Sequence, residues 1–272
     1  MNIKQIIKQS IAIGVMSILT ACGGGGEKSS NACKISKVKD SDGDGFYDVN
    51  DVEPHDAFKN GAFSTPEKII NNPEVKKVIK KAKEYGINIR TDVAHNPPNL
   101  TGYYKLEAGG RVVAAERTHA RGIVYTSSER RLCMKKDQLE MKAVDFKEGK
   151  KGYTYKGIKI RGTGKYYTKY SLLSGTDKGC HTYYIDIESG KVDDSGNIVH
   201  IDKIIVPMTD GSCKSAWGWR VLNFIDFKKV TDLDELERMC VDGDKAYVPG
   251  ETWKNKDKET CKCSVYAETT CE

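Results

Sequence analysis

Residues 166–206 decide the fold class and read YYTKYSLLSGTDKGCHTYYIDIESGKVDDSGNIVHIDKIIV. Three stretches are rich in Tyr, Ile, Val and Thr and alternate between apolar and polar residues: Tyr166–Leu173, His181–Ile187 and Ile198–Val206. This composition and this period of two are typical of half-buried β-strands. Turn-forming residues are expected to separate the strands at 174–177, 188–191 and 194–197. Because no helical pattern comes between them, the strands indicate an antiparallel meander.

Further strands extend this meander toward the N-terminus. Thr101–Leu106 and Gly152–Arg161 have the same composition, and glycine-rich turns follow them at 108–110 and 162–164. The strand signal therefore runs from residue 99 to about residue 227. A meander of this length folds as a sandwich or closes as a barrel, and closure removes exposed strand edges.

An amphipathic helix is expected before the strands. Asn72 suits the N-cap, Pro73 the first helical position and Gly86 the residue after the helix end. Apolar residues recur at helical spacing at Val75, Val78, Ile79 and Ala82. The opposite face carries Lys76, Lys77, Lys80, Lys81 and Lys83. A basic helix can lie on an anionic membrane, but the narrow apolar face favours packing on the domain with the lysines in solvent.

The entry into the strands resembles a known family. Gly86–Ile89 and Asn96–Tyr104 read GINI and NPPNLTGYY. They resemble the start of lipocalin-like domains in bacterial lipoproteins, and residues 189–206 resemble the back half of such meanders. The resemblance covers about residues 64–230. It implies a mainly β fold in which an antiparallel meander closes as a lipocalin-like β-barrel after a short amphipathic helix. A short helix is predicted separately at Asp232–Met239, so we expect the domain to cover residues 64–239.

The first 21 residues have the features of an export signal. Lys4 and Lys8 give a basic start, and the apolar stretch Ile11–Leu19 is shorter than the roughly 20 residues that span a bilayer. The four residues Leu19–Cys22 resemble the lipobox of bacterial lipoproteins. The resemblance implies that residues 1–21 are removed and that Cys22 carries the acyl chains that anchor the protein to a membrane.

Residues 22–39 contain a run of four glycines and few apolar residues, so we expect a flexible tether. The residue after the lipidated cysteine is Gly23 and not Asp, and by the sorting rule of bacterial lipoproteins this implies the outer membrane. Whether the protein would lie on the periplasmic or the outer face stays open.

Residues 40–56 form an acidic segment, DSDGDGFYDVNDVEPHD, with seven acids and no base. Acidic residues at alternate positions around Gly45 can direct oxygen atoms toward one Ca²⁺ ion. The predicted ligands are Asp40, Asp42, Asp44, the carbonyl of Phe46, Asp48 and Asp51. The last position is not the Glu of an EF-hand, and with Pro54 the segment resembles a thrombospondin type 3 repeat. This implies a structural calcium ion; the alternative is a solvated acidic linker.

The charge balance argues against nucleic acid as a partner. The whole chain carries 44 Lys and Arg against 38 Asp and Glu, a net charge of +6. Removal of residues 1–21 takes away two lysines and no acid, which lowers the net charge to +4. This surplus is small for the length of the chain and is not the strong basic patch of a nucleic-acid-binding domain.

The chain has nine cysteines, an odd number. If Cys22 is lipidated, eight remain that can form four disulfides in an exported protein: Cys33, Cys133, Cys180, Cys213, Cys240, Cys261, Cys263 and Cys271. We expect Cys180 to pair with Cys213 because they bracket two predicted strands. Cys33 and Cys133 then remain as a pair by elimination.

Residues 240–272 contain four of these cysteines in a segment too small to fold on an apolar core alone. Three pairings exist, of which Cys261 with Cys263 is sterically the least plausible. The pattern resembles the first half of a von Willebrand factor type C module, although one cysteine of that module is missing. We expect a small disulfide-rich C-terminal module.

The sequence contains no complete catalytic motif, so a non-enzymatic function is expected. The leading hypothesis is a membrane-anchored barrel that binds a ligand or a surface protein or polysaccharide, with an exposed patch near Trp217, Trp219 and Trp253. One alternative is a lipocalin-like carrier of a small apolar molecule, which needs an apolar cavity of several hundred Å³. A second alternative is a hydrolytic enzyme with titratable groups around His181, His200, Asp186 or Glu188.

Overall fold

The computed structural model describes residues 33, 35, 37–41, 47–48, 63–91, 94–107, 109–125, 128–145, 152–177, 180–208, 218–224 and 226–272. These residues belong to one compact unit, 32–272. The predicted signal segment and Cys22 lie outside the described residues, as does most of the acidic segment.

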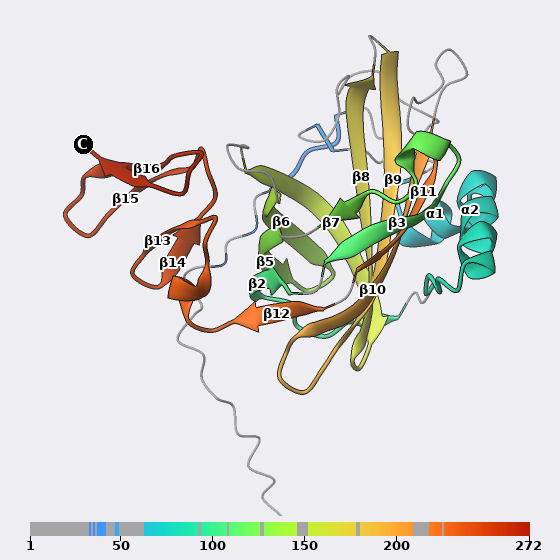
Figure 1. The fold of residues 1–272 in the computed structure, drawn as a ribbon, viewed down its shortest axis with the longest axis horizontal. Helices are drawn as coiled ribbons and strands as arrows, with labels where there is room; N and C mark the ends of the chain where they lie inside the picture. The colour runs from blue at the N-terminus through green and yellow to red at the C-terminus, as the bar shows by residue number, and fades with distance from the viewer. Residues whose placement is uncertain are drawn as a thin grey trace, which may run out of the picture. The chain divides into compact units, whose positions relative to one another are not determined.

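The described residues form two α-helices, two 3₁₀ turns and seventeen strands, most of which Figure 1 labels. The helical elements are α1 (Pro66–Asn71), α2 (Pro73–Glu84), η3 (Thr118–Ala120) and η4 (Leu233–Glu235). The first strands are β1 (His95–Asn96), β2 (Gly102–Leu106), β3 (Gly110–Ala115), β4 (Val124–Tyr125), β5 (Ser128–Lys135), β6 (Gln138–Asp145) and β7 (Tyr153–Thr163). The next are β8 (Tyr166–Asp177), β9 (Cys180–Val192), β10 (Ile198–Met208), β11 (Arg220–Phe224) and β12 (Phe227–Val230). The last are β13 (Cys240–Asp242), β14 (Lys245–Tyr247), β15 (Thr252–Lys254), β16 (Thr260–Cys263) and β17 (Thr269–Cys271).

Eight strands close into an antiparallel barrel, as the sequence predicts. The ring runs β12-β2-β5-β6-β7-β8-β9-β10, and Ile198 of β10 pairs with Phe227 of β12 to complete it. From β5 to β10 each strand pairs with the next one along the chain, which is the up-and-down order of a meander. Figure 1 shows these strands curving around a common interior.

The first and last strands of the barrel bend together. Three residues separate β2 from β3. β2 pairs with β12 and β3 pairs with β11, so the segment β2-β3 runs beside the segment β11-β12. Gly110 lies opposite Phe224, and a Cβ atom at Gly110 would stand 2.2 Å from the Phe224 ring. Glycine at this position therefore lets the ring lie flat across the strand pair.

Two turns predicted from the sequence are wrong. Residues 174–177 and 188–191 belong to β8 and β9, which pair continuously from Tyr166–Lys191 to Asp177–Cys180. Turn composition in the second segment has a packing reason instead. A Cβ atom at Gly190 would stand 2.7 Å from the Tyr167 side chain, so glycine makes room for this ring inside the barrel. The turn at 194–197 is confirmed.

Helix α2 has the ends that the sequence predicts. The Asn72 side chain accepts hydrogen bonds from the backbone N–H groups of Glu74 and Val75, and Gly86 follows the helix with φ of +76°. Val75 and Val78 are buried against the barrel, whereas most of the lysines are exposed. The sequence did not predict α1, which Thr65 caps and which precedes α2 directly.

The barrel has one apolar layer outside and another inside. The outer layer joins residues of the helices to every second residue of β8, β9 and β10, among them Tyr170, Leu172, Ile185, Ile187, Ile204 and Val206. The inner layer fills much of the barrel and includes Leu139, Ile158, Tyr167, Ile201 and Phe227. Figure 1 places α1 and α2 beside the strands at this outer face. Side chains alternate between the two faces of a strand, so the residues of β8, β9 and β10 that lie between those of the outer layer point into the barrel.

The C-terminal residues fold as a small disulfide-linked unit of two sheets, β13-β14 and β15-β16-β17. Disulfides join Cys240 to Cys263 and Cys261 to Cys271, and the implausible pair of Cys261 with Cys263 is absent. A further disulfide joins Cys33 to Cys133 of β5, the pair that remains by elimination in the sequence. The helix predicted at 232–239 is wrong: only the 3₁₀ turn η4 forms there.

Candidate functional site

Charged side chains gather on the inner face of three neighbouring barrel strands. Lys169 of β8 lies directly opposite Glu188 of β9, and Glu188 lies opposite Lys203 of β10. Cross-strand neighbours on one face stand about 5 Å apart, so the register alone brings these three side chains together. Asp186 precedes Glu188 by two residues and faces the same way.

The charges form two ion pairs and one shared contact. Lys169 Nζ lies 2.8 Å from Glu188 Oε2, and the two side chains are only 2% and 3% exposed. Lys203 Nζ lies 2.7 Å from Asp186 Oδ2. Arg130 Nη1 of β5 also reaches Glu188 Oε2, at 3.4 Å. Three basic side chains thus face two carboxylates. Burial lowers the pKa of Lys169, which Glu188 opposes, and with all five groups ionised the cluster retains one uncompensated positive charge.

The cluster controls the ionisation of Glu188. Burial alone would raise the pKa of this carboxyl, but Lys169, Arg130 and Lys203 hold the pKa well below its ordinary value. The Tyr167 hydroxyl donates to Glu188 Oε1 at 3.2 Å, and burial followed by the nearby carboxylate raises the pKa of Tyr167. Glu188 is therefore an anion and Tyr167 a neutral donor at neutral pH.

Arg130 is held in place by aromatic rings. Its guanidinium carbon lies 4.1 Å from the ring centre of Phe227 and 5.9 Å from that of Phe224. A guanidinium over an aromatic face is attracted to it, so these rings restrain the Arg130 side chain. Within the described part of the chain, Glu188 is the only hydrogen-bond acceptor that Arg130 reaches through its side chain.

A cavity of about 110 Å³ lies beside this cluster. Its wall includes Arg130, Ser171, Asp186, Lys203 and the rings of Tyr155 and Phe224. Ser171 and Asp186 are cross-strand partners, and both are buried. Among the described residues, Ser171 Oγ and Asp186 Oδ1 have no hydrogen-bond partner. Buried polar atoms without partners are costly, so these two atoms can accept a polar partner in the cavity, either water or a ligand.

The arrangement suits binding better than acid catalysis. A general acid needs a carboxyl with a raised pKa, whereas three cations lower the pKa of Glu188. Asp186 is committed through one oxygen to Lys203. What remains available toward the cavity is a set of hydrogen-bond donors and acceptors that can hold a small polar molecule.

The two strand histidines of the enzyme hypothesis do not meet. His181 lies near the start of β9, and the register places His200 opposite the far end of that strand. His200 Nε2 lies 3.2 Å from Asp202 Oδ1, in a separate surface groove of about 150 Å³. Asp202 also accepts hydrogen bonds from the Asn88 N–H and the Asn223 side chain, which fixes this side of the barrel to the segment after α2.

The predicted calcium loop is described only in part. Of its six predicted ligands, Asp42, Asp44, Phe46 and Asp51 lie outside the described residues. The Asp48 carboxylate accepts hydrogen bonds from Ser41, through N–H at 2.8 Å and through Oγ–H at 2.7 Å. In the part of the chain that the structure describes, no group of three His, Cys, Asp or Glu side chains is arranged to hold a metal ion. The calcium site stays a prediction.

The acidic segment nevertheless contacts the barrel. The Tyr47 ring packs on Gly157 of β7 so closely that a Cβ atom there would stand 1.9 Å from it, and Gly157 has φ of +67°. Lys159 Nζ lies 5.5 Å from the centre of the same ring. Together with the Cys33–Cys133 disulfide, this contact attaches part of the predicted tether and loop to the barrel.

The predicted aromatic patch does not form around Trp253. This side chain is buried in the C-terminal unit, where its ring stacks on Tyr247 with centres 4.0 Å apart and its Nε1–H donates to Asp242 at 2.7 Å. Trp219 is half-buried, and Trp217 lies outside the described residues. Cys213 is also outside them, so its pairing with Cys180 stays a prediction.

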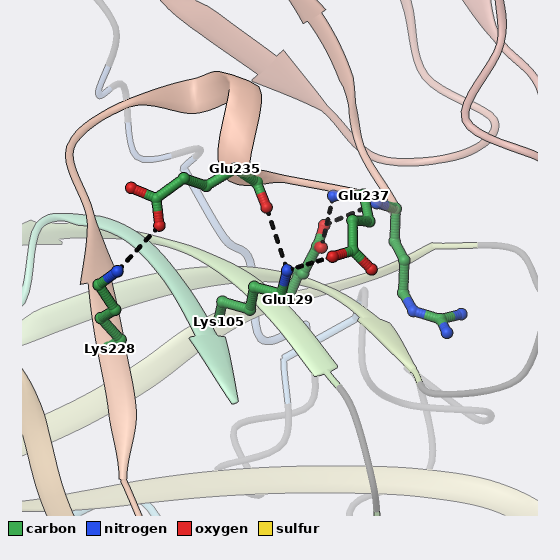
Figure 2. Close-up of polar contacts among 6 residues, drawn as sticks. Lys105, Glu129, Lys228, Glu235 and Glu237 are labelled. Atoms are coloured by element: carbon green, nitrogen blue, oxygen red, sulfur yellow. Dashed lines mark hydrogen bonds and ion pairs between the residues drawn. The ribbon is translucent and has the colours of Figure 1, made fainter. Parts of the chain in front are cut away.

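A second buried carboxylate, Glu129, binds the segment between β12 and β13 to the barrel, as Figure 2 shows. Glu129 of β5 accepts hydrogen bonds from the backbone N–H groups of Glu237 and Arg238, at 2.8 and 3.0 Å. Lys105 of β2 donates to the Glu235 carbonyl at 3.2 Å and pairs with Glu237 at 2.5 Å. Burial raises the pKa of Glu129. Both carboxylate oxygens of Glu129 accept backbone hydrogen bonds, so this contact holds residues 237–238 against the barrel.

Comparison with known proteins gave no match to a protein-family model, a curated protein or a solved structure. No helix among the described residues is both long and apolar enough to cross a membrane.

Sequence reasoning missed Arg130, Lys169, Ser171 and Lys203. Their signal was present as polar residues at alternate positions of the strands, but such a pattern is normally that of a face in solvent. The sequence did draw attention to Asp186 and Glu188, although as catalytic carboxylates and not as members of a charge cluster.

Proposed function

We propose that this protein is an exported, lipid-anchored binding protein that holds a small polar ligand inside its barrel. The observation that carries the proposal is the pair of buried atoms, Ser171 Oγ and Asp186 Oδ1, that face the cavity without partners among the described residues. A native site normally satisfies such atoms by protein, water or ligand. A ligand that donates hydrogen bonds would satisfy both.

The cavity favours this function over the alternative of an apolar carrier. Its volume of about 110 Å³ is below the several hundred Å³ expected for a carrier, and its wall contains Arg130, Asp186 and Lys203. An apolar ligand would leave these groups desolvated and unpaired, which is costly. A surface partner stays a second candidate for the exposed residues of the C-terminal unit, where Tyr266 is 70% exposed.

Lipid anchoring and outer-membrane localisation are part of the proposal and are supported by residues 1–23. Cys22 would carry the acyl chains, and residues 1–21 would be removed. Mass spectrometry of the mature N-terminus tests this directly. Replacement Cys22→Ser should move the protein from the membrane to the soluble fraction, and an unchanged membrane fraction would contradict the anchor.

A structural calcium ion in the acidic segment is also proposed. The supporting features are the alternate acids of residues 40–51 and the attachment of Tyr47 to the barrel, which would make the loop a fixed part of the domain. Calcium should raise the melting temperature of the wild type, and Asp44→Ala should abolish this increase. An equal effect of calcium on both proteins would contradict the site.

The binding function is tested by Ser171→Ala. Removal of a buried hydroxyl without a partner should leave the unfolding free energy unchanged or raise it by up to about 1 kcal/mol. The same replacement should weaken binding of small polar probes, measured as the rise in melting temperature with lactate or glycerol. Ser195→Ala, in an exposed turn, is the matched control and should change neither quantity.

This combination of unchanged stability and weaker binding separates a ligand site from a structural polar core. A crystal structure of the wild type soaked in each probe provides the second readout. If no probe changes the melting temperature and the cavity contains only ordered water, the proposed function is wrong.

A further inference from the structure

Arg130 carries the uncompensated charge of the barrel interior. Lys169 and Lys203 each have a carboxylate within 2.8 Å, whereas Arg130 shares Glu188 with Lys169 at 3.4 Å. A guanidinium has five N–H donors, and only one Arg130–acceptor hydrogen bond forms among the described residues. Because the side chain is about 10% exposed, this positive charge is largely removed from solvent.

A buried charge without a full partner is unfavourable, and a ligand of opposite charge would remove the cost. The cavity lies beside Arg130 and reaches Asp186 and Ser171 on its other wall. Phe227 and Phe224 flank the guanidinium and hold its orientation. A planar guanidinium with a fixed orientation suits a carboxylate, which can accept two parallel hydrogen bonds.

The cavity wall formed by Asp186 and Ser171 needs a hydrogen-bond donor from the ligand. Asp186 Oδ2 is bonded to Lys203, while Asp186 Oδ1 is a buried acceptor without a partner among the described residues. Asp186 opposes Ser171, whose hydroxyl can donate or accept. A hydroxyl group on the ligand would donate to Asp186 and leave the anionic end for Arg130.

We infer that the ligand is a small organic monoanion that carries its own hydroxyl group, a short hydroxycarboxylate in chemical class. One negative charge balances the cluster, and the hydroxyl satisfies Asp186. A cavity of 150 Å³ holds benzene, so about 110 Å³ corresponds to roughly four to six non-hydrogen atoms. Lactate has six such atoms. This inference rests on the proposed function, because it specifies the ligand of the same cavity.

The test compares probes of nearly equal size. Lactate carries both features, propanoate lacks the hydroxyl, lactamide lacks the charge, and glycerol has hydroxyls only. Titration calorimetry with the full-length protein in mild detergent and low-chloride buffer measures each affinity. A ligand this small binds with about micromolar affinity at the tightest, so titrations extend to tens of millimolar.

Lactate should bind most tightly. Propanoate should bind about 10-fold or more weakly, because Asp186 then stays unpaired, and lactamide about 10- to 100-fold more weakly, because Arg130 stays unbalanced. Arg130→Gln should remove the preference for lactate over lactamide. Arg130→Lys keeps the positive charge but not the planar fork, so it should weaken lactate binding and retain the preference for anions.

Arg131→Gln is the matched control, since Arg131 is the next residue of β5 and points to the opposite face, 5.9 Å from the Tyr103 ring. It should leave lactate binding unchanged. If Arg130→Gln does not fold, Arg130→Lys and the probe series on the wild type still test whether the ligand is an anion bound by Arg130.

The outcomes separate the inference from the proposed function. Lactamide or glycerol binding as tightly as lactate overturns the monoanion and leaves a polar-ligand barrel. Propanoate or chloride binding as tightly as lactate overturns the hydroxyl requirement. If none of the probes binds and native mass spectrometry finds no retained small molecule, both the inference and the proposed function are wrong.

Discussion

Replacement of Glu188 by Gln should destabilise the barrel much more than replacement of Lys169 by Met, although both break the same ion pair. In Glu188→Gln, the cations Lys169 and Arg130 both lose their anionic partner. Asp186 is then the one carboxylate left to balance Lys169, Arg130 and Lys203 in the cluster. In Lys169→Met, Arg130 stays 3.4 Å from Glu188 and can take over as its partner. The interior then has two cations and two carboxylates, so it is neutral.

The burial of the pair sets the magnitude. Both side chains are at most 3% exposed, and breaking a buried ion pair by removal of one partner costs about 3–5 kcal/mol. We expect about this cost for Glu188→Gln. For Lys169→Met we expect about 1–2 kcal/mol, the loss of one charged hydrogen bond with the charge balance restored. Since a domain of this kind is stable by about 5–15 kcal/mol, both variants should still fold.

Urea unfolding followed by circular dichroism at pH 7 measures the difference, with equal m-values as the condition for comparing the variants. The double variant should cost less than the sum of the single variants, because the two residues are in direct contact. Lys165→Met, which loses only an exposed pair with Asp194 at 2.5 Å, is the matched control and should change stability by less than about 1 kcal/mol. The reasoning is refuted if Lys169→Met costs as much as Glu188→Gln.

The pH dependence follows from the lowered pKa of Glu188. A carboxyl with a folded-state pKa below its unfolded value of 4.5 contributes stability that is fully present above pH 4.5. This contribution is lost as the pH falls toward the lower folded-state pKa. The stability difference between wild type and Glu188→Gln should therefore be constant from pH 5 to 8 and decrease only in acid.

Three further predictions concern packing and the contact in Figure 2. Gly190→Ala should cost about 1–3 kcal/mol in urea unfolding, because its methyl group would press into the Tyr167 ring. Adding Tyr167→Phe removes the hydroxyl but keeps the ring, so this double variant should recover only part of the cost. A cost near zero for Gly190→Ala would contradict this packing. Gly157→Ala should destabilise the protein, and the double variant with Tyr47→Ala should be more stable than the sum of the single effects predicts; strict additivity would show that the ring does not lie there. Burial raises the pKa of Glu129, so the contribution of its carboxyl to the unfolding free energy is present in acid and is lost as the pH rises through the raised pKa. The stability of the wild type relative to Glu129→Gln should therefore fall from pH 4 to pH 7. A rise over this range would refute the raised pKa.

Several structural features could be predicted because local residues control them. Asn72 and Gly86 mark the ends of α2 since their side chain and backbone freedom act within a few residues. The composition of residues 166–206 specified strands in antiparallel order, and the closed barrel follows from the need to pair both edges. The count of cysteines together with the lipobox left Cys33 and Cys133 as a pair, and the structure joins them.

The errors came from residues whose role depends on distant partners. Residues 188–191 have turn composition, yet Glu188 is fixed by Lys169 and Arg130, and Gly190 by the Tyr167 ring. Trp253 was expected at the surface, but Tyr247 and the cysteines around it form a small core that covers it. In each case a contact between sequence-distant or cross-strand side chains outweighed the local tendency.

The sequence by itself determined that β8, β9 and β10 have one apolar and one polar face, because alternation is a local property of the residues. Only the tertiary structure decided which face lies inside. The helices cover the apolar face that contains Ile185 and Ile187, so closure of the barrel turns Asp186 and Glu188 inward. The candidate site exists because of this inversion: charges that a flat sheet would leave in water are enclosed and must find partners, and Arg130 is left with the least complete one.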